Sequence, residues 1–332
     1  MSSPCWARER ERGSAWLLRI ALLIAFGLGW PAGQLLLLPI TAWFLATSPR
    51  TRAASREYLG RALGRPARAW DIARHVHTFA CAILDRFFLA TGRTRGFRIA
   101  TSGIEHVQAV LARGQGCVLL GAHLGSFEVL RSVAAYAPVP VRPVMFRRNA
   151  GALTRIMDRL DPTLRESVIE IGDTASMMRA HEAVARGEIV GLLADRAPEG
   201  HRPVEAEFLG RTARFPAGPF ILAATLGVPV VLFYAVRTGP RRYQVVFEPF
   251  ADRVTVRRAS RAADLARWAG QYAAALDRAC RDHPYNWFNF YPFWDPSRAA
   301  SDDADLAPPT RARAAAAPRD AQGARPGAPA IP

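Results

Sequence analysis

Short apolar runs alternate with helical patterns from about residue 97 to residue 282, and this alternation constrains the fold most. Apolar or alternating runs predict strands at 97–101, 117–120, 141–146, 168–171, 188–194, 205–209, 228–236 and 242–250. Helical patterns follow most of them, at 104–113, 126–136, 152–160, 173–187, 216–226 and 261–282. Strands that alternate with helices predict an α/β domain with a central, mostly parallel or mixed sheet flanked by helices.

An apolar segment precedes this domain, because the chain has no charged residue from Ile20 to Pro49. A helix needs about 20 apolar residues to cross a bilayer, so the run is long enough. Pro31 and Pro39 interrupt it, which leaves two alternatives: one kinked spanning helix, or two shorter helices that lie in the interface or re-enter it. A cleaved signal peptide fits less well, since no small-residue cleavage pattern follows. We therefore expect this segment to anchor the chain to a membrane.

The charged residues around the apolar segment predict its orientation and the chain's partners. Arginines follow it at positions 50, 52, 56, 61, 65 and 68, and the positive-inside bias places the rest of the chain in the cytoplasm. The formal net charge is +16, which favours an anionic partner such as a membrane surface or an acidic protein. Nucleic acid is not expected, because no recognition motif accompanies the charge. The four cysteines are scattered, as in a reducing compartment, and suggest neither disulfides nor a zinc site.

The chain is thus expected to have four parts. Residues 1–19 form an Arg-rich N-terminal segment, 20–49 the membrane-anchoring segment, 50–296 one globular domain, and 297–332 a disordered tail rich in Ala, Pro and Arg. The globular part ends in an aromatic segment, 285–294. We expect this segment to pack as a strap on the core, with a place at the membrane interface as the alternative.

The candidate catalytic residues are His123 and Glu128, in the sequence Gly121-Ala122-His123-Leu124-Gly125-Ser126-Phe127-Glu128. His123 follows a buried strand and precedes a helix, a position where open α/β sheets place reactive groups. Glu128 would lie in the first helical turn, where the helix dipole favours its ionised form. A carboxylate beside the imidazole would fix its tautomer and raise its basicity. His123 is therefore a candidate general base.

Two further clusters follow strands and are candidate substrate-binding residues. Asp195 and Arg196 come after the strand at 188–194, and Arg147, Arg148 and Asn149 follow the strand at 141–146. If these strands are parallel, both clusters emerge at the sheet edge that carries His123. Arginine at such an edge suits a phosphate group or a developing oxyanion.

Other chemistries lack their motifs. His181-Glu182 has no second histidine at the spacing of a zinc protease, and Ser126 is not in a GxSxG elbow. No GxGxxG or GxxxxGK[ST] sequence precedes a helix, so neither a nucleotide nor a metal cofactor is expected.

The ordered set of motifs resembles the late, lauroyl/myristoyl-type acyltransferases of lipid A biosynthesis, within the glycerolipid acyltransferase superfamily. The resemblance runs from about Trp16 to Trp294 and rests on five segments: the apolar segment, the His123–Glu128 spacing, Val144–Asn149, Leu192–Arg196, and the stretch from Phe208 to Val231. It implies a single acyltransferase domain. The implied activity is O-acyl transfer from an acyl carrier protein or acyl-CoA thioester to a hydroxyl of a lipid or glycolipid acceptor, with His123 as base and Glu128 orienting it. The implied location is the bacterial inner membrane.

Two functions from other classes remain as alternatives. One is a membrane-bound thioesterase or hydrolase that uses water at the same site. The other is a catalytically inactive lipid-binding scaffold, which the intact His123–Glu128 pair disfavours.

Overall fold

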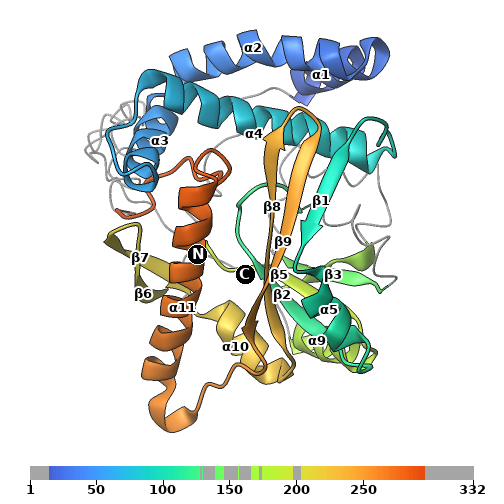
Figure 1. Ribbon diagram of the computed structural model, residues 1–332, viewed down its shortest axis with the longest axis vertical. Helices are drawn as coiled ribbons and strands as arrows, with labels where there is room; N and C mark the ends of the chain where they lie inside the picture. The colour runs from blue at the N-terminus through green and yellow to red at the C-terminus, as the bar shows by residue number, and fades with distance from the viewer. Residues whose placement is uncertain are drawn as a thin grey trace, which may run out of the picture.

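The fold is built on a mixed seven-stranded sheet with the order β1-β9-β8-β2-β5-β3-β4 (Figure 1). The computed structural model describes residues 15–127, 129, 139–145, 156, 166–171, 174–196 and 203–295. The sheet strands are β1 (Arg98–Ser102), β2 (Cys117–Gly121), β3 (Val141–Met145), β4 (Ile169–Glu170), β5 (Ile189–Leu193), β8 (Val230–Gly239) and β9 (Arg242–Ala251). The helices are α1 (Ala15–Leu28), α2 (Trp30–Thr47), α3 (Pro49–Ala62), α4 (Ala69–Ala90), α5 (Ile104–Leu111), α9 (Thr174–Ala185), α10 (Gly218–Leu226) and α11 (Arg261–Asp282).

Strand direction decides which residues share an edge of the sheet. β8, β2, β5, β3 and β4 run parallel, whereas β9 is antiparallel to β8 and parallel to β1. The expected α/β fold with a mixed central sheet is therefore confirmed. In the β2–β5 pair, Gly121 lies opposite Leu193. Residues that follow these two strands consequently emerge side by side at one carboxyl edge.

Helices cover both faces of the sheet, which explains why β2 is apolar at every position. Val118 and Leu120 belong to one hydrophobic cluster together with α11 residues such as Leu276. Cys117 and Leu119 belong to a second cluster, which includes Val107 and Val110 of α5. The alternating side chains of one strand thus join two cores.

The apolar run at 20–49 forms two helices and not one. Gly29 separates α1 from α2 with φ of 88°, and Pro31 lies at the start of α2. The pair crosses over α4 at one end of the molecule (Figure 1). Among the described residues, which begin at Ala15, none of the helices combines the length and hydropathy that a membrane crossing requires. The described helices therefore lend no support to the expected membrane-anchoring segment, and the run is divided into two helices where the first alternative expected one kinked helix.

Several other sequence predictions can be compared with the structure. Residues 49–90, which lie before the first predicted strand, form the two helices α3 and α4, because Gly64 (φ 64°) and Pro66 interrupt the helical pattern between them. The sequence reading missed β7 (Arg211–Pro216), which pairs with β6 (Pro203–Phe208) in an antiparallel hairpin. The helices expected at 126–136 and 152–160 lie largely outside the described residues.

The aromatic strap, residues 285–294, packs on the core as expected. Trp287, Phe288, Phe293 and Trp294 are all buried. Trp287 stacks edge-on against Phe208 and Phe293. These four rings are therefore core residues, and the first half of the strap lies beside the turn that carries His123, because Phe288 N–H donates to the His123 carbonyl.

Candidate active site

The His123 turn, residues 122–126, leaves the carboxyl end of β2 and is held by main-chain hydrogen bonds. Gly125 N–H donates to the Asn286 carbonyl (2.8 Å), and Ser126 N–H donates to the Ala235 carbonyl (2.9 Å). Gly125 has φ of 81°, and a Cβ there would lie 1.8 Å from the Ala235 carbonyl oxygen. Only glycine fits, for reasons of both backbone conformation and space.

Asp195 lies against His123 and engages it twice. The His123 Nδ1 is 2.9 Å from Asp195 Oδ1, and the His123 backbone N–H donates to Oδ2 at 3.0 Å. Asp195 follows β5 as His123 follows β2, so the parallel pairing of these strands brings the two residues together. The carboxylate is fully buried, whereas the imidazole side chain is 34% exposed. Asp195 thus holds a histidine that a substrate can still reach.

The electrostatics of the pair leave His123 neutral and Asp195 charged at neutral pH. Burial opposes ionisation of Asp195, but His123 and Arg196 outweigh it and lower the pKa of Asp195 to about 2. Burial and the nearby Arg196 lower the pKa of His123 below its ordinary value, while Asp195 acts in the opposite direction. Because an ionised carboxylate only accepts hydrogen bonds, the proton of the neutral ring is on Nδ1. The Nε2 lone pair is therefore free to accept a proton.

Trp287 of the strap completes the surroundings of the carboxylate. Its indole Nε1–H donates to Asp195 Oδ2 at 3.0 Å, and the ring is fully buried. The strap also closes on the turn, because Phe288 N–H donates to the His123 carbonyl at 2.9 Å. The sequence analysis expected Trp287 to pack on the core or to lie at the membrane interface, and it did not connect the residue with Asp195. Its indole N–H in a segment otherwise rich in phenylalanine was the available signal.

Arg196, the residue after Asp195, packs against the aromatic strap. Its Nη2–H donates to the Phe288 carbonyl at 2.8 Å, and its guanidinium lies 5.7 Å from the Tyr291 ring centroid. The Nε of Arg196 is buried without a hydrogen-bond partner among the described residues. A cation therefore lies close enough to the neutral imidazole to oppose its protonation.

The structure thus brings together three of the residues that the sequence singled out, namely His123, Asp195 and Arg196. Asp195, expected to bind substrate, makes the contact with the imidazole that the sequence reading assigned to Glu128. Glu128 lies outside the described residues, as do Arg147, Arg148 and Asn149.

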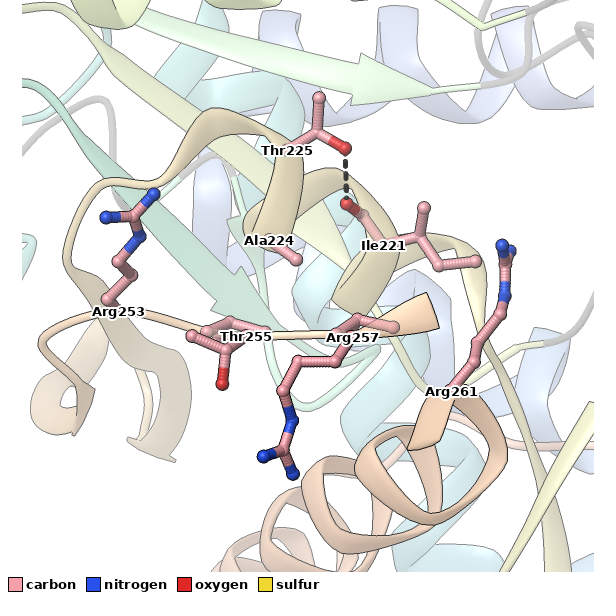
Figure 2. A pocket seen from close by; sticks show the side chains of 9 residues that line it. Ile221, Ala224, Thr225, Arg253, Thr255, Arg257 and Arg261 are labelled. Carbon is pink, nitrogen blue, oxygen red and sulfur yellow. Dashed lines mark hydrogen bonds between the residues drawn. The ribbon is translucent and has the colours of Figure 1, made fainter. Parts of the chain in front are cut away.

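Two cavities in the described part of the chain lie near the sheet, and neither is lined by His123 or Asp195. A cavity of about 460 Å³ lies between α10 and the chain after β9, at the opposite end of the parallel strands from His123. Figure 2 shows its side chains of Arg253, Arg257 and Arg261 pointing in different directions, so they do not converge on one anion. A crevice of about 20 Å³ beside Gly121 has room for at most one water molecule.

Comparison with known proteins identifies the relatives of the chain. The family model described as "Bacterial lipid A biosynthesis acyltransferase" matches residues 8–295. The match includes the apolar helices, the His123 turn, β5 with Asp195, and the aromatic strap. A search of curated proteins found no match.

Proposed function

The chain belongs to the bacterial lipid A biosynthesis acyltransferase family and is an acyltransferase, and we propose that His123 is the general base of its reaction. The proposed reaction moves a fatty acyl group from a thioester, on an acyl carrier protein or coenzyme A, to a hydroxyl of a lipid A-like glycolipid. The observation that carries the proposal is the buried contact between Asp195 and His123 Nδ1, which leaves Nε2 accessible.

In the proposed mechanism, Nε2 of His123 removes the proton of the acceptor hydroxyl as its oxygen attacks the thioester carbonyl carbon. Asp195 stabilises the imidazolium that forms, and it keeps the ring in the required tautomer. When the tetrahedral intermediate collapses, the carbon–sulfur bond breaks and the imidazolium returns its proton to the leaving thiolate. The products are an ester and a free thiol, and His123 is neutral again.

The negative charge that develops on the carbonyl oxygen needs a donor, and we assign that role to Arg196. Its guanidinium bonds the carbonyl of Phe288, whose N–H bonds the His123 carbonyl, and its positive charge lowers the pKa of His123. A charged donor in a partly desolvated site stabilises a developing oxyanion strongly. Arg147, Arg148 and Asn149 remain proposed substrate-binding residues, and Glu128 remains a proposed second catalytic carboxylate, all on the sequence argument alone.

The acceptor is proposed to come from the cytoplasmic face of the inner membrane. Leu23, Leu28, Leu35, Leu38 and Trp43 on α1 and α2 are each more than half exposed, which is unusual for side chains of this size. Such a face suits a helix pair that lies in the membrane interface. The arginine excess of the chain, with its net charge of +16, suits anionic head groups or an acidic carrier protein.

The test is an assay of purified protein in anionic lipid vesicles with a lipid A precursor and a radiolabelled acyl thioester, with products identified by mass spectrometry. Acylated glycolipid formed in step with thiol release supports the proposal. Release of free fatty acid at the full rate, with acceptor present and no acylated lipid, would instead indicate a thioesterase. Lipid binding without release of thiol or fatty acid would indicate a scaffold.

A further inference from the structure

Asp85 is a buried carboxylate far from His123 in sequence, and it joins three parts of the fold. It lies on α4, is fully buried, and accepts hydrogen bonds from Trp30 Nε1 (2.6 Å), Tyr243 Oη (2.8 Å) and Arg237 Nε (3.2 Å). These donors come from the start of α2, from β9 and from β8. A buried carboxylate is stable in its charged form only when such donors replace its hydration. Removal of one donor therefore destabilises the folded protein strongly.

The next contact links Arg237 to the aromatic strap. The Asn286 side chain bonds both main-chain groups of Arg237: its Oδ1 accepts from Arg237 N–H (2.8 Å), and its Nδ2 donates to the Arg237 carbonyl (3.3 Å). Asn286 is 5% exposed, so both bonds are shielded from water. Asp85 fixes the side chain of Arg237, and the main chain of Arg237 fixes Asn286.

The last contact reaches the active site. The Asn286 carbonyl accepts the Gly125 N–H at 2.8 Å, two residues after His123. The other hydrogen bond from the turn into β8, from Ser126 to Ala235, ends two residues before Arg237. The orientation of the His123 turn therefore depends on where Arg237 and Asn286 lie.

We propose that Asp85 is a positioning residue for His123, acting through Arg237 and Asn286, and that Trp30 ties the corner between α1 and α2 to the same carboxylate. The inference rests on the proposed role of His123 as base. It predicts that a substitution that weakens the hydrogen bonds of Asp85 displaces the His123 turn. Such a substitution removes no side chain that contacts the substrate. A displaced base slows the chemical step, because proton transfer needs close alignment of the reacting atoms.

The experiment compares Asp85→Asn with Asp264→Asn in the full chain. Asp264 is a matched control, since it is also a buried helical carboxylate bonded by an arginine, Arg257, and it lies far from His123 in the fold. In Asp85→Asn, kcat should fall about tenfold to a hundredfold while KM for the donor and for the acceptor stays unchanged. Amide hydrogen exchange at Gly125 should speed up, with Leu119 in the centre of β2 unchanged. Asp264→Asn should leave kcat and Gly125 exchange at wild-type values.

A second variant keeps the test decisive if Asp85→Asn does not fold. Asn286→Ala breaks the relay at its next link and should give the same kcat loss and the same faster exchange at Gly125. In the double variant the two effects should be strongly non-additive, because both act through one path. Wild-type exchange at Gly125 in a folded Asp85→Asn or Asn286→Ala protein, or independent effects in the double variant, would overturn the inference. Amide exchange at Gly125 is measured in the absence of substrate. It therefore tests the role of Asp85 independently of whether the acyl-transfer assay supports the proposed function.

Discussion

Asp195 accepts two hydrogen bonds from His123, one from ring Nδ1 at 2.9 Å and one from the backbone N–H at 3.0 Å. The double contact fixes both the ring and the main chain of the candidate base. It also explains why this carboxylate is buried, since its oxygens have donors in His123 and in Trp287.

Replacing Asp195 by Asn should remove most of the activity with little change in overall structure. The amide cannot stabilise an imidazolium, and its NH₂ group favours the wrong tautomer of His123. Turnover should fall about ten-thousandfold, by analogy with catalytic triads whose Asp is replaced by Asn. Initial rates and circular dichroism of the purified variant are the measurements. A folded Asp195→Asn protein with wild-type turnover would remove Asp195 from the mechanism.

Activity should persist below pH 6.5, because burial and Arg196 lower the pKa of His123 from its ordinary value. The neutral imidazole is the active form, so kcat/KM should fall only as pH drops through that lowered pKa. Arg196→Gln removes a cation that opposes protonation, and the acid limb should therefore move to higher pH. Arg253→Gln, an exposed position at the far end of the sheet, is the control and should leave the limb in place. If the acid limb of the kcat/KM profile of Arg196→Gln stays in place or moves to lower pH, His123 is not the group that titrates beside Arg196.

Trp287→Phe should separate the hydrogen bond to Asp195 from the packing of the ring. The variant loses the Nε1–H donor and keeps most of the aromatic contacts, so stability should fall by about 1–3 kcal/mol, with about tenfold loss of kcat. Trp294→Phe is a matched control, because Trp294 is also buried in the strap but donates to the Phe208 carbonyl. It should lose similar stability in urea titrations and retain full kcat. Equal kcat in both variants would show that Trp287 serves packing alone.

The exposed face of α1 and α2 should decide membrane binding. Leu28→Glu/Leu35→Glu should reduce co-sedimentation with anionic vesicles, because two apolar side chains would no longer insert. The matched control is Met177→Glu/Met178→Glu on α9, whose side chains are also exposed. Binding should weaken further as salt is raised, since arginine attraction to the lipid is screened. Unchanged co-sedimentation of the leucine variant would exclude this face as the binding surface.

Local patterns in the sequence were enough for much of the fold. α11 begins and ends where its periodic stripe of Leu265, Trp268, Tyr272 and Leu276 predicted, because a long amphipathic helix carries its own signal. β7 was missed because only Ala213 and Phe215 alternate with exposed Thr212 and Arg214, an apolar pattern too short to stand out in the sequence. Its signal was the Leu209-Gly210 turn, where both residues have positive φ.

The site was predictable only in part. The sequence singled out His123 and Asp195 as residues after strands, on the condition that those strands were parallel. It could not show that β2 and β5 are neighbours, and that pairing turns Asp195 from a candidate substrate ligand into the contact of the imidazole. Trp287 and Asp85 reach the site through long-range contacts, which no local pattern encodes.

The most direct test of the account is the rate of acyl transfer by His123→Gln, measured in vesicles beside the wild-type protein with both shown to be folded. Glutamine keeps hydrogen-bonding capacity but cannot act as a base near neutral pH. The account predicts a loss of about a hundredfold to ten-thousandfold in kcat, with acceptor and donor still bound. Acylated glycolipid formed by His123→Gln at close to the wild-type rate would contradict it.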